Sequence, residues 1–135
     1  MARRRSIYLP GFRHANPIPV ASQVGPILVS GALTGRDPAT QQMPATLDEQ
    51  CANVFGHVEA LMAAAGATTD DIVKMTFHLA DPADREPLNR QWTAMFPDPQ
   101  SRPARQVIAA RLDGGALVHC ELMAVLGEPA VGEES

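Results

Sequence analysis

An arginine just ahead of an apolar run is the residue whose type and setting best suit ligand binding. It lies in the stretch SRPARQ, residues 101–106. Pro103 fixes the backbone before Arg105, so the side chain starts from a stiff point. A guanidinium can hold a carboxylate through two parallel hydrogen bonds. The same pattern also fits a surface arginine paired with an acidic neighbour, because most arginines are solvated.

The last apolar stretch, residues 117–126, has a polar face. Side chains alternate across a strand, so His119, Glu121 and Met123 are predicted to share one face and the apolar residues between them the other. A histidine and a glutamate two residues apart could orient a water molecule or transfer a proton. They also fit an ordinary exposed face. A metal site is disfavoured, because these are the only two candidate ligands with suitable spacing.

The other reactive residue types lack the patterns of catalytic sites. Ser30 is not in the G-x-S-x-G pattern of a nucleophile elbow, so we interpret it as a hydrogen-bonding residue. Cys51 and Cys120 form no C-x-x-C motif, and Cys120 falls on the predicted core face, where a thiol is inert. There is no G-x-G-x-x-G motif and no P-loop.

The first half of the chain predicts two strands and a long helix. Strands are expected over residues 18–24 and 27–31, the first at a sheet edge because Pro17 and Pro19 cannot donate to a ladder. Thr46 followed by Glu49 is a capping box. An apolar stripe follows it over about five turns, and Gly66 stands where a C-terminal cap belongs.

The second half predicts three strands and a shorter helix. Alternation favours a strand over residues 71–79, and Asp84 is expected to cap a helix that continues to about Phe96, with Trp92 on its core face. Strands over 105–112 and 117–126 are expected to form a hairpin through the turn at residues 113–115. This order predicts an α+β two-layer sandwich, a mixed sheet with two helices on one face.

Length and charge narrow the function. A chain of 135 residues predicts a single domain, with an ordered core over about 6–126 and an acidic tail over 127–135. The net charge of -4 disfavours nucleic-acid partners, and the basic cluster at residues 3–5 is interpreted as a solvated end. No apolar run approaches the roughly 18 residues of a membrane span. We therefore predict a cytoplasmic protein with reduced thiols.

Four stretches together resemble the RidA/YjgF family, also called the L-PSP endoribonuclease family. They are LVSG at 28–31, AAAG at 63–66 followed by DIVK at 71–74, LN at 88–89 ahead of MF at 95–96, and RPAR at 102–105. The final ELMAV at 121–125 fits the family's last strand. The resemblance spans about residues 16–126. It implies a chorismate-mutase-like fold and a homotrimer with clefts between subunits.

The resemblance also implies a reaction and its residues. In active members an arginine, here Arg105, binds the carboxylate of a 2-imino or enamine acid. Water then releases ammonia without a metal or organic cofactor. The family's Ser-Gly and asparagine correspond to Ser30, Gly31 and Asn89 as substrate-binding residues. His119 stands where a water-positioning glutamate is expected, and Glu121 matches the second glutamate of the last strand.

Two further departures separate the chain from the family's deaminases. The first-strand region, residues 17–22, has no tyrosine, and Val107 replaces a common cysteine. The arginine is kept while the residues that manage water are altered.

Three functions follow from these features. The first is a cofactor-independent hydrolase or deaminase of small carboxylate-bearing imines or enamines, with Arg105, His119 and Glu121 as catalytic residues. The second is a non-catalytic trimer that binds a small metabolite. The third, a ribonuclease or translation inhibitor, is disfavoured by the acidic charge.

Overall fold

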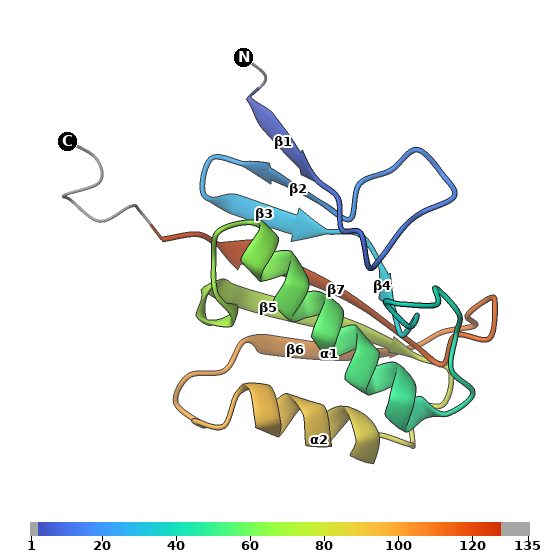
Figure 1. Ribbon diagram of the computed structural model, residues 1–135. Coiled ribbons are helices and arrows are strands. Elements are labelled where there is room, and N and C mark those ends of the chain that lie inside the picture. Colours follow the sequence, from blue (N-terminus) through green and yellow to red (C-terminus); the bar gives the residue numbers. More distant parts are fainter. Residues whose placement is uncertain (1–2, 128–135) are drawn as a thin grey trace.

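A computed structural model describes residues 3–127, in which a seven-stranded sheet is covered on one face by two helices. The strand order is β1-β2-β3-β7-β5-β6, and short β4 pairs with β7 beyond the end of β3 (Figure 1). The β5–β6 pair is parallel and the other pairs are antiparallel. The strands span Arg4–Ile7, Ala21–Val24, Ile27–Ser30, Leu33–Thr34, Ile72–Leu79, Ala104–Ala109 and Val118–Val125, numbered β1 to β7.

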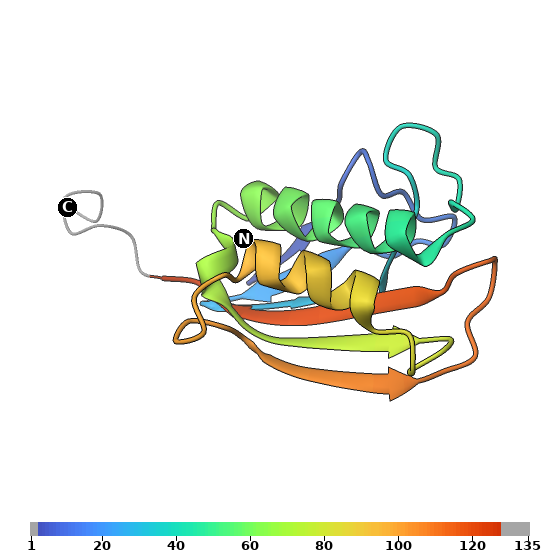
Figure 2. The ribbon, with the colours of Figure 1, turned by 90° about the horizontal axis from the view of Figure 1, so that it is seen from below.

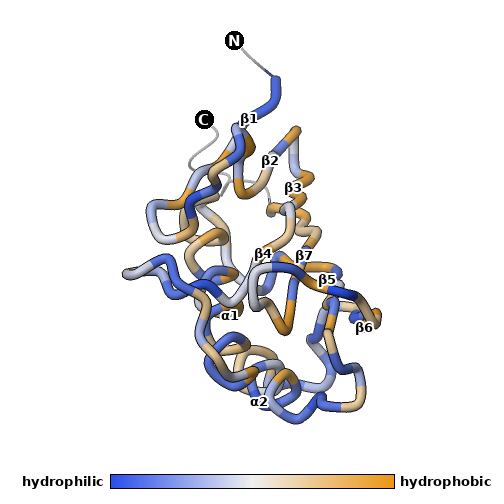
Figure 3. The backbone as a smooth tube through the Cα atoms, turned by 90° about the vertical axis from the view of Figure 1, so that its right-hand side faces the viewer, coloured by the Kyte–Doolittle hydropathy of each residue, from blue (hydrophilic) through white to orange (hydrophobic). Residues whose placement is uncertain are grey.

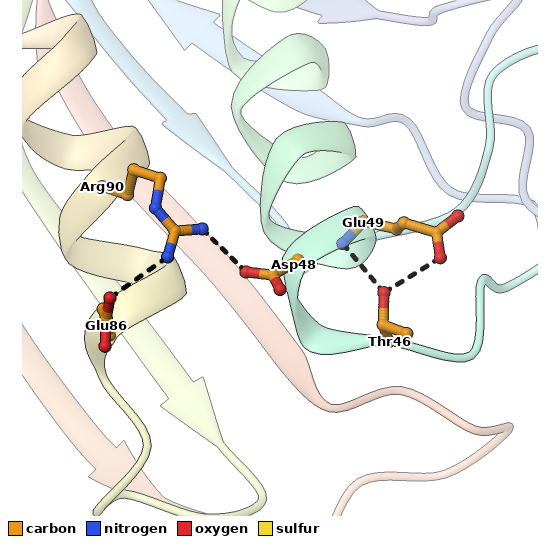
Figure 4. A network of polar contacts seen from close by, with 5 residues as sticks. All are labelled: Thr46, Asp48, Glu49, Glu86 and Arg90. Carbon is orange, nitrogen blue, oxygen red and sulfur yellow. Dashed lines mark hydrogen bonds and ion pairs between the residues drawn. The ribbon is translucent and has the colours of Figure 1, made fainter.

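Helices α1 (Leu47–Ala64) and α2 (Glu86–Met95) lie side by side on one face of the sheet and leave the other face open (Figure 2). The predicted Thr46 cap is confirmed, because its hydroxyl accepts from the Glu49 backbone N–H at 3.2 Å. The reciprocal bond of the predicted capping box is absent, because Glu49 Oε1 accepts from the Thr46 hydroxyl at 2.9 Å instead of from its backbone N–H. Arg90 of α2 contacts Asp48 of α1 at 2.9 Å and Glu86 at 3.3 Å, which joins the two helices at the surface (Figure 4). The predicted α+β sandwich is confirmed.

The core lies between the helices and the inner faces of β5 and β7. Phe77 of β5 is fully buried, stacks on Phe55 of α1 and meets the edge of Trp92 of α2. The alternation predicted for the last strand is confirmed, because Cys120 and its alternate neighbours are buried while Glu121 is exposed. Figure 3 shows many hydrophobic positions along β3, β5 and β7 and a hydrophilic β1 at the edge.

The predicted hairpin between the last two strands is wrong. β7 does not pair with β6, because β5 lies between them and pairs with both. Gly114 and Gly115 do take the left-handed backbone that glycine favours, with φ of 65° and 78°, but their turn carries the chain across the end of β5. β6 also ends at Ala109, earlier than expected.

Two other expectations are corrected at the ends of elements. The N-cap of α2 is Arg85, and no side chain caps it, so Asp84 does not serve as its cap. The first predicted strand begins only at Ala21, after Pro17 and Pro19, and β1 pairs with it from Arg4 onward. The predicted acidic tail falls largely outside the described residues. Neither described helix combines the length and apolarity that crossing a membrane requires.

Candidate active site

Arg105 lies on β6, the edge strand beneath α2, and its side chain is half-buried on the helix side of the sheet. Its register partner is Met75, which belongs to the buried face of β5. The Nη1 atom donates to Asn89 Oδ1 at 2.8 Å, and the guanidinium carbon lies 5.1 Å from the centre of the Trp92 ring. A hydrogen bond and an aromatic face therefore orient the guanidinium.

No acidic side chain neutralises Arg105 within residues 3–127, where both ion pairs are made by Arg90. Burial lowers the pKa of Arg105, and the nearby positive charge of Arg85 lowers it further. The guanidinium stays protonated all the same, because an arginine pKa lies far above neutral pH. The Arg105 guanidinium is thus held in place, partly shielded from water and not paired with a carboxylate of the described residues. Such a cation is suited to binding an anion.

His119 and Glu121 lie on β7 and face the open side of the sheet, opposite to the helices. His119 is half-buried between His78 of β5 and Thr34 of β4, its register partners on the two neighbouring strands. Burial first, and then the charge of His78, lower the pKa of His119, so its imidazole is neutral at pH 7. Neither ring nitrogen hydrogen-bonds to another described residue.

Ser30 is buried where the ladder between β3 and β7 ends. Its Oγ accepts from the Leu122 backbone N–H at 2.9 Å and donates to the Gly31 carbonyl at 2.8 Å. Gly31 is exposed, and its N–H donates to the Val20 carbonyl at 2.9 Å. The Ser30 hydroxyl thus takes the place of a backbone hydrogen bond between β3 and β7. It is already bonded within the chain as both acceptor and donor.

An open hollow of about 220 Å³ lies on the uncovered face of the sheet. Ser30, Lys74, Thr76 and Glu121 line its polar part, and Arg105 does not reach it. The structure therefore brings Arg105 together with Asn89, and Glu121 together with Ser30. Within one chain it keeps these two groups on opposite faces of the sheet.

Two residues near Arg105 were missed by sequence reasoning as parts of a site. Trp92 was expected to be core, and at 8% exposure it is, but its ring face also lies under the guanidinium. Arg85 belongs to none of the motifs found in the sequence. The available signal was helical spacing, because Arg85, Asn89 and Trp92 are separated by four and three residues and so share one face of α2.

The cysteines are both free and buried. Burial raises the pKa of the Cys51 thiol to about 12 and also raises that of Cys120. Both are therefore neutral thiols at pH 7, which agrees with the inert character predicted for Cys120.

Comparison with known proteins places this architecture in a family. The family model described as Endoribonuclease L-PSP matches residues 18–126. A RutC family protein of Aquifex aeolicus is 30% identical over 115 residues, which cover 81% of this chain and 92% of the relative. The 2-iminobutanoate/2-iminopropanoate deaminase of Escherichia coli is 29% identical over 104 residues, covering 76% and 81%.

A solved structure agrees with this result. The crystal structure of Escherichia coli TdcF with bound serine superposes with a TM-score of 0.82 at 25% identity, covering 91% of this chain and 99% of that one. The chain belongs to the L-PSP endoribonuclease family, which is the RidA/YjgF family, and has its chorismate-mutase-like fold.

Proposed function

We propose that this protein is a cofactor-independent deaminase of small carboxylate-bearing imines or enamines. Arg105 holds the substrate carboxylate through paired hydrogen bonds. Water adds to the imine carbon, the C–N bond breaks, and ammonia leaves with a 2-keto acid. The observation that carries the proposal is the half-buried guanidinium of Arg105, which Asn89 and Trp92 orient and no described carboxylate neutralises. A relative named as a 2-iminobutanoate/2-iminopropanoate deaminase supports it.

The water-managing residues of this proposal are His119 and Glu121, with Ser30, Gly31 and Asn89 as substrate-binding residues. A neutral imidazole can accept a proton from water, and the lowered pKa of His119 keeps it neutral at pH 7. Asn89 acts by holding Arg105, since its Oδ1 already accepts from that guanidinium. Apart from Asn89, these groups meet Arg105 only if a second chain places its open face against the α2 side of the first.

The proposal therefore includes a homotrimer with clefts between subunits. Its support is the open face of the sheet, where the neighbouring strands β3 and β7 expose large apolar side chains: Ile27, Val29, Met123 and Val125. Such a contiguous apolar patch is typical of an interface. Light scattering should give the mass of three chains for the native protein and a smaller mass for Met123→Glu. Ile18→Glu, at an exposed apolar residue outside the strands, is the control and should stay assembled.

A second candidate function is a non-catalytic trimer that binds a small carboxylate-bearing metabolite. The replacement of a family glutamate by His119, while the arginine is kept, favours it. A related structure, TdcF, contains bound serine. Ribonuclease activity is disfavoured by the net charge of -4. A cytoplasmic location is also part of the proposal, and the two free thiols support it.

The deciding experiment follows keto-acid release from the 2-imino acid of alanine, generated in place by an amino acid oxidase. Native protein should accelerate release, and Arg105→Ala should lose about 100-fold or more in kcat/KM, because two charge-assisted hydrogen bonds disappear. Arg90→Ala is the matched control and should keep full activity. Absence of acceleration by native protein contradicts the deaminase proposal. Thermal stabilisation by 2-keto acids without turnover would instead support the binding function.

A further inference from the structure

A second arginine lies one helical turn before Asn89, the residue that accepts from the Arg105 guanidinium. Arg85 is the N-cap of α2, is exposed, and donates from Nε to the Pro82 carbonyl at 2.8 Å. This bond anchors the inner part of the side chain. Its two terminal nitrogens make no hydrogen bond to any residue in the range 3–127, so both are free to donate to a ligand.

The two arginines flank Asn89. Arg85 precedes Asn89 by one helical turn, and the Asn89 backbone N–H donates to the Arg85 carbonyl at 2.8 Å. On its other side Asn89 accepts from Arg105 at 2.8 Å. Because Arg105 reaches back over Trp92 toward Asn89, its guanidinium points toward the turn of α2 that carries Arg85. After burial, the positive charge of Arg85 is the second cause that lowers the pKa of Arg105.

The two acidic residues next to Arg85 in the sequence do not cancel this charge. The Glu86 carboxylate contacts Arg90 at 3.3 Å, and Asp84 forms no ion pair with Arg85. Arg85 itself makes no ion pair among the described residues. Two like charges held near one another repel, and an anion that touches both would relieve that repulsion. A ligand with two carboxylates fits this arrangement better than a ligand with one.

We propose that Arg85 binds a second acidic group of the substrate, so that this site prefers 2-imino dicarboxylic acids to 2-imino monocarboxylic acids. The inference rests on the proposed role of Arg105. In this arrangement Arg105 takes the carboxylate beside the imine, and Arg85 takes the carboxylate at the far end of the substrate. The preference for a second carboxylate then depends on the N-terminal turn of α2. It does not depend on His119 and Glu121, which are proposed to position the water.

Binding of stable product analogues tests the preference without requiring turnover. The dissociation constants of 2-oxoglutarate and pyruvate are measured by calorimetry at fixed salt for the native protein, Arg85→Gln, Arg85→Lys and Arg105→Gln. Native protein should bind 2-oxoglutarate about tenfold or more tightly than pyruvate, the scale of one charge-assisted contact. Arg85→Gln should remove most of that ratio, Arg85→Lys should keep part of it, and Arg105→Gln should weaken both ligands. Arg13→Gln is the control for net charge.

The outcomes separate the two proposals. A native ratio near one, a ratio unchanged by Arg85→Gln, or no detectable binding of 2-oxoglutarate overturns the role of Arg85. A ratio lost equally in Arg13→Gln also overturns it, because the preference would then follow overall charge. The deaminase proposal is judged separately, by release of pyruvate from the alanine-derived imine. A protein can therefore pass one test and fail the other.

Discussion

Two arginines at helix α2 differ in whether a carboxylate neutralises their charge. Arg90 lies on α2 and donates to Asp48 of α1 and to Glu86 of its own helix, and these contacts raise its pKa. Arg105 faces the same helix from β6, but there it finds an amide, an aromatic ring and another cation, and its pKa is lowered. Arg90 joins two helices. Arg105 holds a charge that the fold itself leaves unmatched.

A similar contrast separates two histidines. His57 of α1 is 3% exposed, contacts Phe12 edge to face, and its Nε2 bonds to the Arg36 carbonyl at 2.6 Å. His119 is half-buried and makes no hydrogen bond to another described residue. Polar groups without a partner mark the candidate site more sharply than residue type does, because this chain contains both paired and unpaired arginines and histidines among its described residues.

The sharpest test of the comparison exchanges arginine for lysine at both positions. Lysine keeps the charge but loses the planar fork, so Arg105→Lys should lower kcat/KM for imine hydrolysis by about 100-fold. Arg90→Lys should change it by less than about twofold, since an exposed ion pair tolerates a point charge. Steady-state kinetics checks both variants. Equal losses at the two positions would break the distinction.

The next effect concerns the aromatic support of Arg105. Trp92→Leu removes the ring face and should raise KM several-fold, on the scale of about 1 kcal/mol for a cation–π contact. Trp92→Phe keeps an aromatic face and should restore most of the affinity. Thermal melts must accompany the kinetics, because both changes shrink a core residue. A KM that follows stability alone would assign Trp92 to packing only.

The histidines should differ in their effect on stability as pH falls. Burial chiefly lowers the pKa of His57, so below about pH 6.5 the unfolded chain binds a proton that the folded chain refuses. Stability is therefore full above this pH and declines below it, until the folded pKa is reached. The decline is at most about 1.4 kcal/mol per pH unit for each such histidine.

Urea unfolding between pH 5 and 7 tests this decline. His57→Gln should flatten the decline in stability more than His119→Gln does. His119 is less buried, and burial is the main cause of the lowered pKa at both histidines. A steeper profile in either variant would contradict the assignment of neutral histidines in the folded state.

The smallest effect is expected at the surface ion pair. Asp48→Asn should lower the Tm by no more than a few degrees and leave imine hydrolysis unchanged, because solvent and salt screen exposed charges. A melt in low and high salt should show the difference shrinking as salt is added. A large loss of activity would connect Arg90 to the site after all.

Much of this architecture could be predicted from local patterns. The Thr46 cap, the helix stripe and the alternating faces of β7 depend on residues close in sequence, and they are confirmed. Strand neighbours depend on distant residues, so alternation could not reveal that β5 lies between β6 and β7. β1 was missed because RRSI carries a single apolar residue, which is enough for an edge strand held by backbone bonds.

The site was predictable only in part for the same reason. The pattern around Arg105 marked the residue, but which face of the sheet it occupies depends on the register with Met75. The helical spacing of Trp92 predicts that it is buried. It does not predict that the guanidinium of Arg105 packs on its ring face. A bulge between Ile72 and Lys74 also breaks the alternation at the start of β5, where Ile72 is buried and Lys74 is exposed.

The central place of the last strand has a consequence for how the protein is made. β7 pairs with β3, β4 and β5, although it leaves the ribosome after all the other strands of residues 3–127. Until Val118–Val125 emerges, β3 and β5 each present an unpaired edge, and the N-terminal strands β1 to β3 are not joined to β5 and β6. Folding of the sheet must therefore wait until residue 125 has emerged, and nascent chains that stall before residue 118 are the ones most exposed to aggregation.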